Sequence, residues 1–95
     1  MLKKQTLKRG HVKVTFEVDY LTDADLVEIS GDWNQWELEP MKKYKNGKHK
    51  YWATLEPKQE YQFRYRLDGE KWENEWEADK YVPNEHGAEN SVVVC

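Results

Sequence analysis

The segment SGDWNQW, residues 30–36, places two tryptophans, Trp33 and Trp36, three residues apart in a predicted turn. A turn is usually exposed to water, so two such large apolar rings are difficult to bury there together. The chain carries five Trp, six Tyr and two Phe among 95 residues, which is more aromatic surface than one small core needs. A rigid exposed ring gives a large contact area at little entropic cost, so exposed aromatic rings often mark binding surfaces. The chemistry that these residues favour is non-covalent recognition by aromatic stacking.

The residue types that usually carry catalysis do not form a recognisable constellation. The chain has no glycine-rich phosphate loop and no serine in a nucleophile elbow. Its three histidines, His11, His49 and His86, are far apart, without a cysteine or a second histidine at metal-ligand spacing. Carboxylates are numerous, but proximity alone does not separate a general acid from a general base. We therefore expect no enzymatic activity, no cofactor and no metal ion.

The composition favours one soluble domain, residues 1–95, because no linker or repeat divides the chain. Fifteen Lys plus Arg against 18 Asp plus Glu give a net charge of -3, which disfavours nucleic acid as a partner. The basic segment MLKKQTLKRG lacks the apolar run of a signal peptide, and no stretch approaches transmembrane length. The one cysteine, Cys95, can form no internal disulfide. We expect a cytoplasmic protein without a membrane partner.

Alternation of apolar and polar residues indicates an all-β fold. In HVKVTFEV, the residues Val12, Val14, Phe16 and Val18 share one face of a half-buried strand. Similar short patterns predict strands at 26–30, 61–67 and 90–94 and a hairpin over 41–55. Short strands separated by turn signals predict an immunoglobulin-like antiparallel β-sandwich of about seven to eight strands.

Three turns are expected between these strands. The first is LTDAD, residues 21–25. Asn46-Gly47 is the preferred dipeptide of a type I′ hairpin, in which both residues have positive φ. Asp68-Gly69 predicts another tight turn. The hairpin around Asn46 is rich in lysine, which indicates either a solvated strand edge, the interpretation we favour, or a patch for an anionic ligand. Its lysines are Lys42, Lys43, Lys45, Lys48 and Lys50.

Three motifs, SGDWNQW, YQFRYRLDG and GAENSVVV, occur in this order along the chain. Together they resemble carbohydrate-binding module family 48, and the similarity runs from about Val12 to Val94. That family includes the early-set domain at the N-terminus of isoamylases and branching enzymes, and the glycogen-binding domain of AMP-activated protein kinase β subunits. The segment ENEWEADKYVPNEHGAENS resembles small stand-alone bacterial members of the group. The resemblance implies a β-sandwich and an α-glucan ligand such as glycogen or starch.

The resemblance also implies a carbohydrate-binding set of four residues. Glycogen-binding members use two tryptophans, a basic residue and an asparagine, and the matching positions here are Trp36, Trp72, Arg64 and Asn90. Arg64 stands where lysine is usual, and the alternating pattern separately places it on the polar face of its strand. The segment DGEKW is one residue longer than the DGQW of glycogen-binding members, which leaves two orientations of Trp72 open.

Each of these positions also has an ordinary structural interpretation. Trp36 is either a displayed ring, which we favour, or a ring that covers one end of the sandwich. Arg64 is either a ligand-binding group or a solvated strand arginine paired with nearby acids. Asn90 is either a ligand-binding amide or a turn residue that bonds to its own backbone.

Arg66 and Trp76 are secondary candidates. Arg66 shares the polar strand face with Arg64. Trp76, between two glutamates, is either a third stacking ring or a lid packed on the sheet, and we favour the lid. Trp33 is expected to lie in the core and Trp52 to be structural.

Two hypotheses of function follow. The first is a non-catalytic α-glucan-binding module. The second is a protein-interaction or structural early-set domain without sugar affinity, which associates with a glycogen-metabolising enzyme or with itself.

Overall fold

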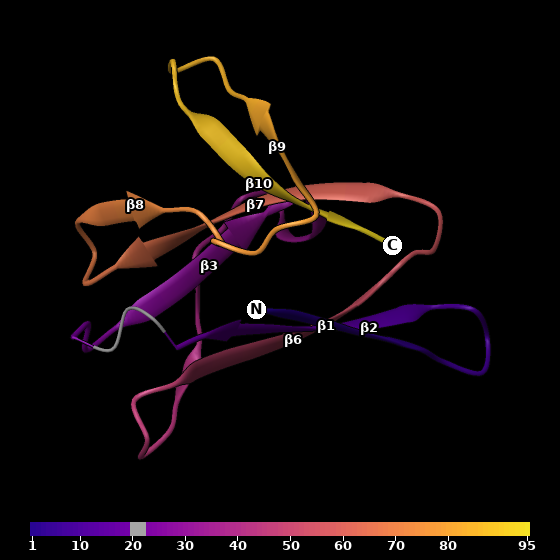
Figure 1. Ribbon diagram of the computed structural model, residues 1–95, viewed down its shortest axis with the longest axis horizontal. Coiled ribbons are helices and arrows are strands. Elements are labelled where there is room, and N and C mark those ends of the chain that lie inside the picture. The colour runs from indigo at the N-terminus through magenta and orange to yellow at the C-terminus, as the bar shows by residue number, and fades with distance from the viewer. Residues whose placement is uncertain (20–22) are drawn as a thin grey trace.

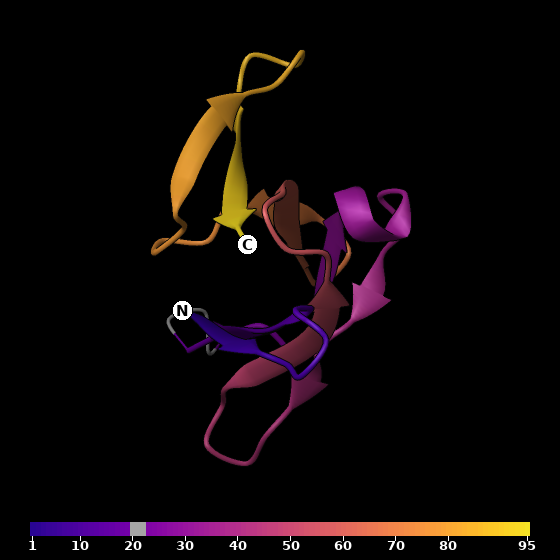
Figure 2. The same cartoon turned by 90° about the vertical axis from the view of Figure 1, so that its right-hand side faces the viewer.

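The computed structural model describes residues 1–19 and 23–95, and within them the protein is all-β. Two antiparallel sheets form two layers (Figures 1 and 2). In chain order the elements are β1 (Leu2–Thr6), β2 (Val12–Val18), β3 (Val27–Gly31), the short 3₁₀ turn η1 (Asp32–Asn34), β4 (Glu39–Pro40), β5 (Lys42–Lys43), β6 (His49–Leu55), β7 (Glu60–Leu67), β8 (Lys71–Glu73), β9 (Lys80–Pro83) and β10 (Glu89–Val94). Among the described residues there is no helix of the length and apolarity needed to cross a membrane.

The order of the strands confirms the predicted sandwich. One sheet has the order β1-β2-β6-β5, and the other has the order β4-β3-β7-β10-β9 with β8 paired to β7. This is the immunoglobulin arrangement, in which strands A, B, E and D face strands C, F and G. The described residues contain ten strands rather than seven to eight, because β1, β4, β8 and β9 lie outside the predicted ranges.

The core lies between the two layers and follows the predicted alternation. The inward residues of β2, Val14 and Phe16 among them, are fully buried, as are Phe63 and Tyr65 of β7. The ring of Trp33 stacks on Phe16 with the ring centroids 5.0 Å apart, so Trp33 is a partly buried side chain packed against the core.

One of the predicted turns is wrong in type. Gly47 has a φ of 86°, but Asn46 does not have a positive φ. The loop is instead a three-residue turn, closed by a hydrogen bond of 3.0 Å from the Gly47 amide to the Tyr44 carbonyl. The side chain of Asn46 accepts a hydrogen bond from the Lys48 amide at 3.0 Å, which stabilises this alternative.

The turn at Asp68-Gly69 is confirmed. Both residues have positive φ, 50° and 69°, and the Glu70 amide donates to the Leu67 carbonyl at 2.9 Å. These are the features of a type I′ turn. In the predicted turn at 21–25, residues 21 and 22 lie outside the described residues.

Candidate ligand-binding site

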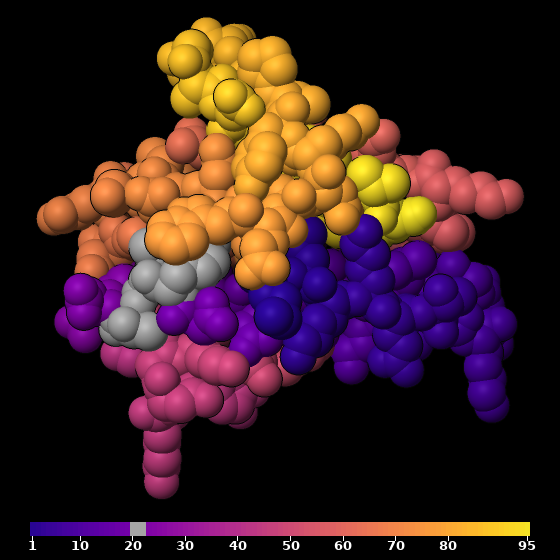
Figure 3. Space-filling view, in the orientation of Figure 1, coloured from indigo at the N-terminus to yellow at the C-terminus, as the bar shows by residue number. Residues whose placement is uncertain are grey.

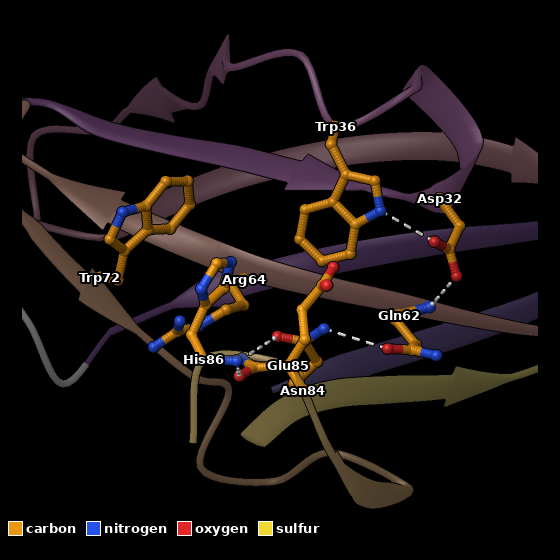
Figure 4. A pocket seen from close by; sticks show the side chains of 9 residues that line it. Asp32, Trp36, Gln62, Arg64, Trp72, Asn84, Glu85 and His86 are labelled. Atoms are coloured by element: carbon orange, nitrogen blue, oxygen red, sulfur yellow. Dashed lines mark hydrogen bonds between the residues drawn. The ribbon is translucent and has the colours of Figure 1, made fainter. Parts of the chain in front are cut away.

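The four residues that the resemblance singled out line one open cavity of about 740 Å³. Trp36, Arg64, Trp72 and Asn90 come from four different parts of the chain. Five further residues complete the lining: Asp32, Gln62, Asn84, Glu85 and His86. In the view of Figure 4 the two indoles stand on either side of the cavity, with Arg64 between them. The volume is within the range of small-molecule binding sites in proteins.

The register of β8 fixes the orientation of Trp72. Trp72 is paired with Arg66 across the β7–β8 ladder, so both side chains project from the same face of the sheet. Arg64, two residues away from Arg66, shares that face. Leu67 pairs with Lys71, and the additional residue of the DGEKW segment is therefore accommodated in the turn. Of the two open orientations, Trp72 adopts the one that faces the cavity.

Two arginines support the ring of Trp72. The guanidinium carbon of Arg64 lies 5.7 Å from the ring centroid, and that of Arg66 lies 5.1 Å from it. Such cation–π contacts hold an exposed indole in place. Arg64 takes part in no ion pair among the described residues, so its position differs from that of a strand arginine paired with acids. Arg66 donates to the Gly69 carbonyl at 2.8 Å and does not line the cavity, so it supports Trp72 from outside.

Trp36 is displayed by a strained loop. Gln35 and Trp36 both have left-handed backbone angles, with φ of 59° and 62°, which costs energy for residues with a side chain. The Trp36 amide donates to the Gly31 carbonyl at 2.9 Å, and its indole nitrogen donates to Asp32 Oδ1 at 2.9 Å. The ring is 38% exposed, and that of Trp72 is 37% exposed. The structure therefore presents two indoles to solvent at one cavity.

A hydrogen-bonded brace holds this loop on the sandwich. Asn34 accepts a bond from the Gly31 amide at 3.1 Å and donates to Glu39 Oε2 at 2.5 Å. The same oxygen accepts a bond from the Tyr51 hydroxyl at 2.6 Å. The bonds from Tyr51 and Asn34 lower the pKa of Glu39, whereas burial raises the pKa of Tyr51. At neutral pH Glu39 is thus a carboxylate that ties the loop to β6.

Asn90 is buried, with 8% of its surface exposed, and both the nitrogen and the oxygen of its side-chain amide are hydrogen-bonded. Its amide nitrogen donates to Gln62 Oε1 at 3.0 Å, and its oxygen accepts from the Asn84 amide nitrogen at 3.1 Å. Asn84 Oδ1 also accepts hydrogen bonds from the backbone amides of His86 and Ala88, at 2.9 and 3.1 Å. Asn84, rather than Asn90, is therefore the turn residue that satisfies its own loop. Asn90 positions Gln62 and the 84–88 loop at the cavity.

The other secondary candidate, Trp76, does not line the cavity. Its side chain is 62% exposed, too exposed for the packed lid that we favoured. The segment between β8 and β9 is instead anchored by Glu75, which is fully buried and accepts the Tyr65 hydroxyl at 2.9 Å. The Glu75 amide donates to Ser91 Oγ at 2.8 Å.

Sequence reasoning missed the five remaining residues of the lining. Gln62 could have been identified, because it alternates with Arg64 on the polar face of β7. Asp32 lies in the SGDWNQW motif and bonds to both Trp36 and the Gln62 amide. Glu85 and His86 had no such signal, because they reach the cavity only through the pairing of β9 with β10.

The cavity offers two flat apolar faces, one fixed cation and several amide and carboxylate groups. Such a set suits a ligand that has both apolar faces and many hydroxyl groups. No protein-family model matches this chain, and no curated protein matches it either.

Proposed function

We propose that this protein is a non-catalytic α-glucan-binding module of the early-set type, acting in the cytoplasm. The observation that supports the proposal is the meeting of Trp36, Trp72 and Arg64 at one open cavity. The same three positions carry the resemblance to the glycogen-binding members of carbohydrate-binding module family 48.

The chemistry of an α-glucan matches the lining of this cavity. Each glucose ring has a mildly apolar face of C–H groups, which stacks on an indole, and a rim of hydroxyl groups that both donate and accept. Arg64 donates several hydrogen bonds in a rigid fork, and the amide of Gln62 both donates and accepts. The carboxylates of Asp32 and Glu85 are further acceptors at the rim.

The expected affinity for a short oligosaccharide is weak. A polar contact with a neutral sugar replaces a contact with water, so each one contributes only about 0.5–1.5 kcal/mol. The dissociation constant is then on the order of micromolar to millimolar. Retention on a polymer increases when several copies bind one chain.

Retention on immobilised glycogen tests the proposal. Wild-type protein is expected to be retained and to be eluted by maltoheptaose, and Trp36→Ala is expected to pass through. Trp52→Ala is the matched control, because Trp52 is 42% exposed, as Trp36 nearly is, but lies on β6 in the other sheet. Unretained wild-type protein would contradict the proposal and favour an interaction domain without sugar affinity.

A further inference from the structure

Positive and negative charges are segregated along this chain. Residues 1–18 and 41–50 hold ten of the 15 Lys and Arg residues and a single acid, Glu17. The remainder holds five basic residues and 17 acids. The basic segments form β1, β2, β5 and the start of β6, which belong to one sheet. The net charge of -3 therefore conceals a basic layer and an acidic layer.

The outward side of the basic sheet carries a ladder of lysines around one exposed indole. Cross-strand pairing puts Lys3, Thr15 and Trp52 in one row. The neighbouring rows contain Lys13 and Lys50, and Lys42 is paired with Lys50. We call this surface the lysine face, and it consists of Lys3, Lys13, Lys42, Lys48 and Lys50 around Trp52.

The lysine face remains positively charged in spite of Glu17. Glu17 is buried and forms ion pairs with Lys48 at 3.1 Å and with Lys3 at 3.7 Å. Burial acts to raise its pKa, but the hydrogen bond and charge of Lys48 hold the pKa below its ordinary value. The charges of Lys3, Lys48 and Lys50 thus act on one carboxylate, and Lys13 and Lys42 add two further positive charges to the face. The ring of Trp52 adds apolar contact area at the centre of this charge.

The opposite layer carries the complementary surface. Residues 68–89 contain eight acids and two lysines. Within them the segment 73–79 (ENEWEAD) contains Trp76, the most exposed large apolar side chain among the described residues, followed directly by the exposed Glu77. The other three acids of this segment are paired within the molecule: Glu73 with Lys71, Glu75 with the N-terminal ammonium, and Asp79 with Lys4. In Figure 3 the region around this segment lies on the surface that faces the viewer. Neither Trp76 nor Glu77 lines the cavity.

Within one molecule, segment 73–79 lies against the edge of the basic sheet, because Glu75 pairs with the N-terminal ammonium and Asp79 pairs with Lys4, each at 2.6 Å. The inward residues of β2 face the second sheet, so the lysine face points away from the layer that holds the acidic segment. We propose that segment 73–79 of one copy docks on the lysine face of a second copy, with Trp76 and Trp52 in the contact. Because the two surfaces differ, the association is head-to-tail, and its length grows with concentration. Opposite charges steer and register such a contact.

Sedimentation velocity of the wild-type protein tests the association. At about 0.02 M salt the weight-average mass is expected to rise with protein concentration, and at about 0.5 M salt it is expected to return to that of the monomer. A monomer at every concentration in low salt would overturn the proposal. Trp36→Ala is expected to associate as the wild type does, which separates this result from that of glucan binding.

Two variants with opposite defects test the pairing of surfaces. Lys13→Glu/Lys50→Glu lowers the net charge of the lysine face, with Glu17 included, from +4 to 0. Trp76→Ala/Glu77→Lys removes the exposed ring of segment 73–79 and reverses the charge of its exposed acid. Each variant alone is expected to lose association at least about tenfold, with an unchanged circular dichroism spectrum. An equal mixture is expected to form a complex of two copies, because each variant retains the surface that the other lacks.

A mixture that remains monomeric, or a single variant that associates as the wild type does, would overturn the proposal. Phosphatidylserine vesicles identify the other occupant that a basic surface could take. Binding of the wild type to these vesicles, lost in Lys13→Glu/Lys50→Glu and without self-association, would also overturn it.

Discussion

The indole nitrogen of Trp36 donates a hydrogen bond of 2.9 Å to Asp32, four residues earlier in the same loop. The other carboxylate oxygen of Asp32 accepts the backbone amide of Gln62 at 2.7 Å. One side chain thus links the displayed ring to the strand that carries Arg64 (Figure 4). The position of the indole is therefore set by the sheet as well as by its own loop.

Removing one half of this link is expected to weaken glucan binding. In Asp32→Asn the amide group replaces one acceptor oxygen, so one of the two bonds is lost at a cost of about 1–3 kcal/mol. We expect the dissociation constant for maltoheptaose to rise severalfold by calorimetry. Asp68→Asn is the control, because a single oxygen of Asp68 accepts both of its backbone bonds and the site is elsewhere. Equal effects of the two substitutions would contradict the role of Asp32.

The left-handed backbone of Gln35 predicts a stabilising substitution. Relief of strain in Gln35→Gly is worth about 1–2 kcal/mol, and the greater freedom of glycine in the unfolded chain offsets about half of it. We expect the free energy of unfolding to rise by about 0.5–1 kcal/mol in a urea titration. Glu37→Gly, in the same loop without a positive φ, is expected to lower it. A lower stability of Gln35→Gly would refute the strain argument.

The strands with alternating apolar and polar residues could be predicted from the sequence, and the edge strand β1 could not. β2 and β7 have an alternating pattern because one face of each strand packs on the core, where Phe16 and Phe63 are fully buried. β1 pairs only with β2 at the sheet edge, and most of its residues are exposed, so no periodic pattern marks it. The turn at Asn46 differed in type because its side chain bonds to the Lys48 amide, a local choice that dipeptide preference does not determine.

The candidate site was predictable where a strand or a motif fixed it. Arg64 followed from alternation on β7, and Trp36 followed from its motif. The direction of Trp72 depended on the register Arg66–Trp72, which the length of the loop alone left open. Asn90 was assigned to the ligand, but its amide is already bonded to Gln62 and Asn84. Only the packing of β10 against β7 and β9 reveals this.

The contact between Gly31 and Trp33 predicts a destabilising substitution. A Cβ at residue 31 would lie 2.6 Å from Trp33 Cζ3 and 2.9 Å from the Gln62 carbonyl oxygen. We expect Gly31→Ala to lower the free energy of unfolding by about 1–3 kcal/mol. Trp33→Phe removes the indole atoms in the clash, so the cost of Gly31→Ala should be smaller in that background. A double-mutant cycle by urea unfolding measures the difference, and strict additivity would contradict the clash.

Buried His49 predicts a loss of stability in acid. Burial, followed by the charge of Lys43, lowers the pKa of His49 from its ordinary 6.5. The unfolded chain therefore takes up this proton at a higher pH than the folded protein does. The contribution of neutral His49 to the free energy of unfolding is therefore fully present above about pH 6.5. It is lost as the pH decreases toward the pKa of His49 in the folded protein, by at most about 1.4 kcal/mol per pH unit. The pKa of Glu39 is lowered from its ordinary 4.5, so protonation of Glu39 causes a further loss of stability below about pH 4.5. Urea titrations of the wild type and of His49→Leu at several pH values measure the effect. If the free energy of unfolding changed equally with pH in the two proteins above about pH 5, the prediction would be contradicted.

Intrinsic tryptophan fluorescence during a titration with maltoheptaose tests the glucan-binding proposal most directly. A Trp52→Phe/Trp76→Phe background removes two exposed indoles that do not line the cavity. We predict a saturable change in emission, with a dissociation constant on the order of micromolar to millimolar, that Trp36→Ala abolishes. Emission that stays constant up to the highest sugar concentration would contradict α-glucan binding at this cavity.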